Sequence, residues 1–127
     1  MSFRTLGLAA VAAATLAAPL SAQAAGDAVK GKALFNQQCA LCHSAAAGAE
    51  GAAPSLFGVV GRKAASDAGY PAYSKALKAS GLTWKPANLD TFLSGPVKLV
   101  PGTNMPITLA DPVGRQNVIA YLATLKK

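Results

Sequence analysis

The apolar residues near the end of the chain follow the period of a helix. They recur at spacings of three and four residues, which places them on one face: Val118, Tyr121, Leu122 and Leu125. Asp111 and Pro112 precede this stripe, and a carboxylate cap followed by proline is a typical helix start. The pattern therefore predicts an amphipathic C-terminal helix that begins at Pro112.

Three shorter helices are predicted by similar signals. They span about residues 28–38, 74–81 and 86–95, and Asp27 and Ser74 are the expected N-caps of the first two. The apolar residues expected on their packed faces are Val29, Leu34, Phe35, Leu89, Phe92 and Leu93. No segment alternates convincingly between apolar and polar residues over six positions, so no strand is expected.

The pattern as a whole predicts an all-α fold of three to five helices joined by long loops. Residues 95–106 contain three prolines and are expected to form a stiff loop rather than a helix. So few helices in about 100 residues bury only a small core. A rigid apolar cofactor at the centre would supply what that core lacks.

Residues 1–24 have the pattern of a secretory signal peptide. Arg4 lies near the amino terminus, a run of thirteen uncharged and mostly small residues follows, and small residues precede the end of the segment. Thirteen residues are too few to span a bilayer. We therefore expect cleavage after Ala24, with Ala25 as the next choice, and a single mature domain of residues 25–127 in the periplasm.

Composition narrows the function classes. The chain has 127 residues, 52% hydrophobic and 13% charged, so it is long enough for one domain and too apolar to be disordered. The net charge is +7 and falls to +6 when Arg4 leaves with the signal peptide. One His and five acidic residues leave little material for acid–base catalysis, so an enzyme is not expected.

The segment Cys39–His43 has the sequence C-x-x-C-H, the signature of covalent haem attachment. Both thiols lie on one side of a helical turn, where each can add across a haem vinyl group, and His43 can bind the iron. Three other uses stay open: a structural disulfide, a thioredoxin-like thiol pair and a zinc site. Haem c is favoured over each of them. A C-x-x-C disulfide closes only a small loop and would stabilise little, and a thioredoxin-like pair needs a strand pattern that is absent around Cys39. A zinc site would need a second cluster of ligands, which the sequence lacks.

The axial ligands follow from a count of residues. Without the signal peptide the chain has one His and one Met, so a second histidine cannot serve as ligand and Met105 is the one thioether left. Its loop begins with Pro101-Gly102, which suits a type II turn, and Pro106 follows, so the loop has little freedom. Met105 is the expected sixth ligand. A lysine or Asn104 as ligand, an open iron, and Met105 as core filler are the alternatives.

Several segments together resemble the class I cytochromes c, close to the mitochondrial type and its bacterial periplasmic relatives. The resemblance covers nearly all of residues 26–127 and rests, besides C-x-x-C-H, on Phe57–Lys63 (FGVVGRK), Gly81–Trp84 (GLTW), Pro101–Met105 (PGTNM) and Val118–Leu122 (VIAYL). It implies a fold in which the terminal helices pack against each other beside one covalently bound haem. Gly31 and Phe35 would lie where those helices cross.

The resemblance also implies roles for residues outside the attachment motif. The carbonyl group of Pro54 would accept a hydrogen bond from His43. Arg62, Tyr73 and Trp84 would hold a haem propionate, and Thr103 would hydrogen-bond near the other edge. Without the resemblance, the residues alone favour ordinary core aromatics with hydrogen-bonded polar tips for Tyr73 and Trp84, and a solvated side chain for Arg62. The predicted site is Cys39, Cys42, His43, Pro54, Arg62, Tyr73, Trp84, Thr103 and Met105, with His43 and Met105 on iron.

The chain departs from the mitochondrial pattern in several respects: the loop of residues 44–53 is one residue shorter, and an extra residue lies near residues 70–73. Phe92 stands where mitochondrial members usually have a tyrosine near the methionine ligand, so that hydrogen bond is absent. Ala33, Gln38 and Val97 stand where those members carry lysines around the exposed haem edge, and Lys98 keeps one. The docking surface is therefore expected to be less basic than the mitochondrial one.

The predicted function is a periplasmic electron carrier in which iron alternates between Fe(II) and Fe(III) with both ligands retained. Redox-partner proteins such as a membrane oxidoreductase, an oxidase or a periplasmic dehydrogenase would exchange electrons at the haem edge. No nucleic-acid partner or membrane insertion is expected, and the protein is expected to be a monomer. The alternatives are a haem subunit of a larger dehydrogenase or oxidase complex, and a haem enzyme with an open iron.

Overall fold

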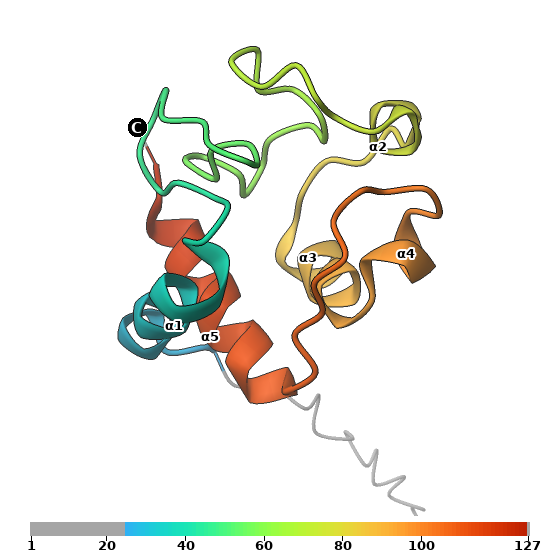
Figure 1. The fold of residues 1–127 in the computed structure, drawn as a ribbon. Coiled ribbons are helices and arrows are strands. Elements are labelled where there is room, and N and C mark those ends of the chain that lie inside the picture. Colours follow the sequence, from blue (N-terminus) through green and yellow to red (C-terminus); the bar gives the residue numbers. More distant parts are fainter. Residues whose placement is uncertain (1–24, 127) are drawn as a thin grey trace, which may run out of the picture.

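The computed structural model describes residues 25–126, and the predicted signal peptide of residues 1–24 lies outside them. The regular structure consists of α1 (Ala28–Leu34), the π-helical segment η1 (Phe35–Cys39), α2 (Lys75–Ala79), α3 (Pro86–Ser94), α4 (Pro96–Leu99) and α5 (Pro112–Thr124) (Figure 1). Within these residues, strand pairing is limited to an isolated bridge, and no helix is long and apolar enough to cross a membrane. The all-α prediction is confirmed.

The terminal helices α1 and α5 cross in close contact (Figure 1). Gly31 lies so near the backbone of Asn117 that a Cβ atom there would overlap the Asn117 carbonyl oxygen. The ring of Phe35, which is 2% exposed, packs edge-on against Tyr121 with the ring centroids 5.3 Å apart. The backbone N–H of Asp27 donates a hydrogen bond of 2.8 Å to Oδ1 of Asn117. The predicted crossing at Gly31 and Phe35 is confirmed.

Three helices begin at caps that the sequence predicts: Asp27, Ser74 and Asp111. In each case the side-chain oxygen accepts hydrogen bonds from backbone N–H groups of the first turn, which have no partner inside the helix. Pro112 is the first residue of α5, as the helix-start pattern predicts. Val118 and Leu122 of the predicted stripe are buried, and so is Ile119, which the stripe leaves out.

Two predictions about the helices are wrong. Residues 95–106 contain the short helix α4, because proline fits the first position of a helix, where its missing N–H would have no partner anyway. Val29, which was expected on a packed face, is 81% exposed. The helix α1 packs against α5 through the face that carries Gly31. Val29 is two positions away and therefore lies about 200° around the helix, on the exposed side.

The long segment between η1 and α2 has no helix and is held by backbone hydrogen bonds. Its residues pair with the segment before α3: the N–H of Gly61 donates to the carbonyl of Trp84 at 2.7 Å, and the N–H of Trp84 donates to the carbonyl of Arg62 at 2.9 Å. A third bond of 2.8 Å joins the N–H of Ala64 to the carbonyl of Leu82. This pairing brings Arg62 and Trp84, 22 positions apart in the sequence, to one side of the central cavity.

Candidate functional site

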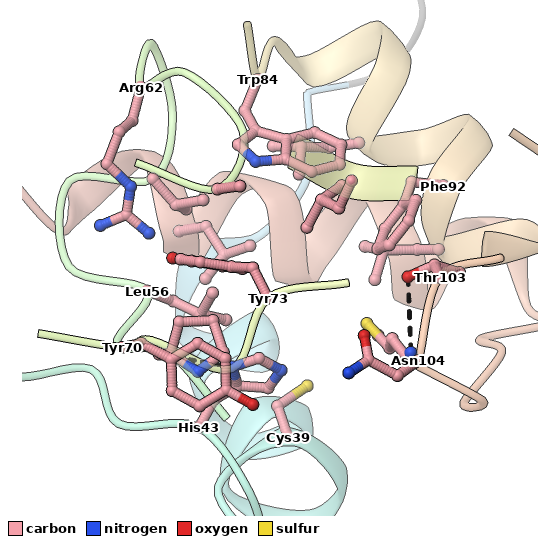
Figure 2. A pocket seen from close by; sticks show the side chains of 18 of the residues that line it. Cys39, His43, Leu56, Arg62, Tyr70, Tyr73, Trp84, Phe92, Thr103 and Asn104 are labelled. Carbon is pink, nitrogen blue, oxygen red and sulfur yellow. Dashed lines mark hydrogen bonds between the residues drawn. The ribbon is translucent and has the colours of Figure 1, made fainter. Parts of the chain in front are cut away.

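A cavity lies between the C-x-x-C-H motif and the loop that follows α4 (Figure 2). Its accessible volume is about 240 Å³, whereas a single water needs only about 10–15 Å³. Voids larger than a water are few in folded domains, so this one fits a large bound group. The lining is mostly apolar and includes every predicted site residue except Cys42: Cys39, His43, Pro54, Arg62, Tyr73, Trp84, Thr103 and Met105.

The imidazole of His43 is oriented by one hydrogen bond. Its Nδ1 lies 2.7 Å from the carbonyl oxygen of Pro54, and because a carbonyl can only accept, Nδ1 carries the hydrogen and donates. Burial lowers the pKa of His43 below its ordinary value, and the bond to Pro54 opposes part of that shift. The imidazole is therefore neutral at neutral pH, and the lone pair on Nε2 is free to bind a metal.

Cys39 is the last residue of η1, and Cys42 lies on the tight turn that follows it. The carbonyl of Cys39 accepts hydrogen bonds from the N–H groups of both Cys42 (3.1 Å) and His43 (2.9 Å), which brings the two thiol-bearing residues to neighbouring positions. Cys39 is partly buried and lines the cavity, whereas Cys42 is exposed. Burial raises the pKa of the Cys39 thiol, so it stays protonated at neutral pH.

The alternative uses of these residues gain no support from the geometry. Cys39 and Cys42 are both free thiols, which leaves each of them able to form a thioether. In the part of the chain that the structure describes, no three His, Cys, Asp or Glu side chains converge to form a metal site.

Met105 lines the cavity from the loop that follows α4. Its neighbours in the sequence, Thr103 and Asn104, line the same wall (Figure 2). The loop begins with the predicted turn: the N–H of Thr103 donates to the carbonyl of Val100 at 3.0 Å, and Gly102 has a φ of 91°, as a type II turn requires at that position. The N–H of Met105 then donates to Oγ1 of Thr103 at 3.4 Å. The side chain of Thr103 therefore supports the backbone of Met105 directly.

Three hydrogen-bond donors gather on the other side of the cavity, where Figure 2 shows Arg62, Tyr73 and Trp84. The guanidinium of Arg62 donates to the carbonyls of Phe57 (2.9 Å) and Ser55 (2.8 Å), which holds its charge in place. The hydroxyl oxygen of Tyr73 accepts a 3.3 Å hydrogen bond from a backbone N–H. Burial raises the pKa of Tyr73, so its phenol stays protonated and can donate. A cation and two neutral donors suit a carboxylate group.

Comparison with known proteins decides the family. A sequence model of the cytochrome c family matches residues 28–126. The chain is 46% identical over 102 residues to cytochrome c2 of Rhodopila globiformis, which covers 80% of this chain and 95% of the relative. It is 41% identical over 102 residues to cytochrome c of Euglena viridis, which covers 80% of this chain and 99% of the relative. The chain belongs to the cytochrome c family.

A solved structure agrees with this assignment. Cytochrome cH from Methylobacterium extorquens superposes with a TM-score of 0.72 at 46% identity, covering 78% of this chain and 99% of that chain. The predicted class I cytochrome c fold is thus confirmed. Membership of the cytochrome c family implies one covalently attached haem c and electron transfer rather than enzymatic catalysis. The apolar cavity, the free thiols and the carboxylate-binding donors fit that group.

Two contacts around the cavity, made by Tyr70 and Asn104, were not predicted from the sequence. The hydroxyl of Tyr70 donates to the carbonyl of Ala52 at 3.2 Å, and its ring lies edge-on to Tyr73 with centroids 5.0 Å apart. The amide of Asn104 donates to the carbonyl of Ala72 at 3.3 Å. Both contacts tie the loop of residues 65–73 to other cavity walls. The one signal in the sequence was the close pair of tyrosines.

Proposed function

We propose that this cytochrome c is an exported electron carrier whose haem iron is bound by His43 and Met105. The observation that carries the proposal is the oriented imidazole of His43, whose Nδ1 is held by Pro54 at 2.7 Å so that Nε2 is available for iron. Met105 lines the same cavity from the loop after α4 and is the one thioether of the mature chain. A His and Met pair stabilises Fe(II) and raises the reduction potential.

The chain's own residues hold and shield the cofactor. Cys39 and Cys42 would each add a thiol S–H across one vinyl group, forming a C–S bond and leaving no by-product. Arg62, Tyr73 and Trp84 would donate hydrogen bonds to a propionate, which offsets the cost of a carboxylate at the cavity wall. When bound, the haem supplies one-electron redox chemistry at iron. The apolar walls of Leu56, Leu89, Phe92 and Leu122 exclude water, so little solvent has to reorganise during electron transfer.

The first residues of the chain support an exported carrier. Residues 1–24 carry the three-part pattern of a secretory signal, and cleavage after Ala24 would release residues 25–127 to the periplasm. Export is consistent with two cysteines that are consumed by haem attachment rather than by a disulfide. Redox enzymes of the periplasm and its bounding membrane would then be the electron donors and acceptors.

A redox titration of the purified protein, followed through its visible spectrum, tests the proposal. His and Met ligation predicts a low-spin spectrum in both oxidation states, one reversible one-electron transition and a positive potential. Carbon monoxide should bind slowly, because both axial positions are filled. A high-spin spectrum with rapid carbon monoxide binding at neutral pH would instead establish an open iron. Mass spectrometry of the exported protein measures the cleavage site and the single attached haem.

A further inference from the structure

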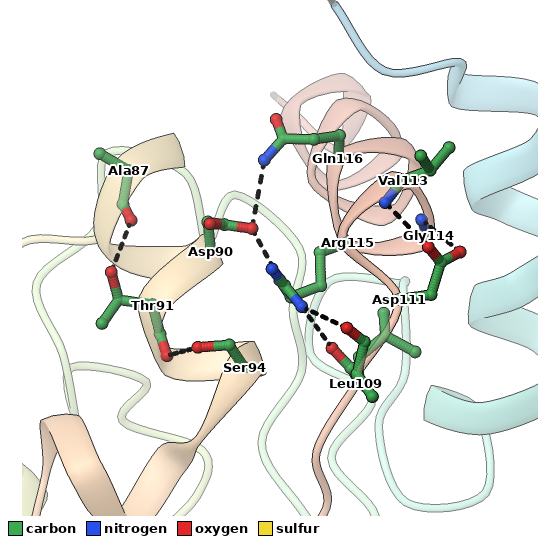
Figure 3. Close-up of polar contacts among 11 residues, drawn as sticks. Ala87, Asp90, Thr91, Ser94, Leu109, Asp111, Val113, Gly114, Arg115 and Gln116 are labelled. Carbon is green, nitrogen blue, oxygen red and sulfur yellow. Dashed lines mark hydrogen bonds and ion pairs between the residues drawn. The ribbon is translucent and has the colours of Figure 1, made fainter. Parts of the chain in front are cut away.

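The side chain of Arg115 joins three parts of the chain (Figure 3). It projects from the first turns of α5, and its Nε donates to Oδ1 of Asp90 on α3 at 2.8 Å. One terminal nitrogen donates to the carbonyls of both Leu109 (2.9 Å) and Ala110 (2.8 Å). The Arg115 side chain is 12% exposed and that of Asp90 28%, so the ion pair is partly shielded from water.

Two further contacts complete this arrangement, which we call the Arg115 clamp (Asp90, Leu109, Ala110, Arg115 and Gln116). The amide of Gln116 donates to the same oxygen of Asp90 at 3.2 Å, so α5 holds the carboxylate through two residues. The backbone N–H of Leu109 donates to the carbonyl of Leu93 on α3 at 2.8 Å. Both peptide groups of residues 109–110 are therefore fixed to α3 and α5.

The clamp lies immediately beyond the loop that carries Met105. On the N-terminal side of Met105, the loop is held by Asn104, which donates to the carbonyl of Ala72 at 3.3 Å. On the C-terminal side, residues 106–108 make no hydrogen bond with any residue that the structure describes. Leu109 is thus the first fixed point after Met105. The position of the thioether depends on where the clamp holds that end of the loop.

We propose that Arg115 and Asp90 are positioning residues that keep Met105 on the haem iron by anchoring the C-terminal end of its loop. The inference rests on the proposed His43 and Met105 ligation. A neutral thioether competes with external ligands mainly through its local concentration at the iron. If the clamp is released, the loop gains conformations in which the sulfur is displaced, and external ligands bind more readily.

A purely stabilising role for Arg115 makes a different prediction, and α5 offers a matched control. Asn117 lies two residues further along α5 and accepts a hydrogen bond of 2.8 Å from the N–H of Asp27 on the opposite, α1 side. Asn117→Ala therefore weakens the packing of the same helix without touching the methionine loop. The two roles are separated by comparing variants at both positions.

The experiment titrates the ferric holoprotein with imidazole, which replaces a displaced methionine, and records the melting temperature of each variant. Arg115→Gln is expected to raise the affinity for imidazole by about tenfold, equivalent to about 1.4 kcal/mol. Asp90→Asn should have a smaller effect, because the amide oxygen still accepts from Arg115. Asn117→Ala should lower the melting temperature and leave the imidazole affinity within about twofold of wild type. Amide hydrogen exchange at Leu109 should accelerate in Arg115→Gln and not in Asn117→Ala.

The outcomes are distinguishable. Equal gains in imidazole affinity for Arg115→Gln and Asn117→Ala, at equal loss of melting temperature, would overturn the positioning role. If Arg115→Gln does not fold, Asp90→Ala is compared with Asn117→Ala instead, because Asp90 is the more exposed residue of the ion pair. Met105→Ala, titrated alongside, reports on the ligation itself: an imidazole affinity equal to that of wild type would mean that Met105 does not bind iron, which is a failure of the proposed function rather than of the clamp.

Discussion

Gly31 of α1 lies against the carbonyl group of Asn117 in α5, with no room for a side chain between the two backbones. Gly26 meets the neighbouring carbonyl of Gln116 in the same way. These contacts set how closely the helices approach. Since Val118 and Leu122 of α5 line the cavity, the crossing also fixes one wall of the haem site.

Gly31→Ala is expected to reduce the free energy of unfolding by about 3 kcal/mol, because the added methyl group forces two helix backbones apart. Chemical denaturation of the holoprotein measures the change. Gly69→Ala is the matched control, since the atoms nearest to its added Cβ belong to the side-chain carboxylate of Glu50, which can move away. Equal stability of the two variants would show that the crossing accommodates a side chain after all.

The cofactor is expected to complete the core. In Cys39→Ala/Cys42→Ala, haem attachment should be abolished, and the chain should lose most of its helical circular dichroism, because the cavity of about 240 Å³ would be left unfilled. Retention of a cooperative thermal transition and wild-type helix content without haem would mean that the apolar residues alone specify the fold.

Most of the helices could be predicted because their signals are local. The caps Asp27, Ser74 and Asp111 act on N–H groups two or three residues away, so sequence alone contains both partners. The face of Val29 could not be predicted, since it depends on where α5 packs. The helix α4 was missed because the prolines of residues 95–106 indicate a loop as readily as Pro96 indicates a helix start.

In the site, too, the sequence identifies residues by local motifs but does not determine contacts between distant parts of the chain. The C-x-x-C-H motif and the single methionine after residue 24 identify the candidate ligands from sequence. The bond from Tyr70 to Ala52 spans 18 positions, and the ion pair of Arg115 with Asp90 spans 25. Any of several donors could reach those acceptors in another arrangement of the loops, so only the folded chain selects the partner.

Met105→Ala should leave the haem attached, because both thiols and His43 are unchanged. The reduction potential is expected to fall, since the thioether that favours Fe(II) is replaced by water or an external ligand. Cyanide binding to the ferric protein should become faster. The measurement is a redox titration of wild type and variant under the same conditions. An unchanged potential and an unchanged spectrum in Met105→Ala would show that this residue never bound iron.

The docking surface is expected to rely on apolar contact more than on charge. Val97 and Ile107 are 57% and 53% exposed on either side of the methionine loop. Surface charges are screened beyond about 8 Å at physiological salt, whereas apolar contact is not. The net charge of +7 over the whole chain therefore does not by itself determine the rate of electron transfer to a partner.

Stopped-flow electron transfer to the membrane fraction of the source cells tests this surface. Raising salt from low to physiological strength should slow the reaction by less than about threefold. Val97→Asp should slow it by about tenfold or more, because docking would desolvate an unpaired carboxylate. Lys75→Ala, the control that removes an exposed charge from α2, should change the rate by less than about twofold. A steep loss of rate with salt, together with a wild-type rate for Val97→Asp, would show that the basic side chains dominate docking.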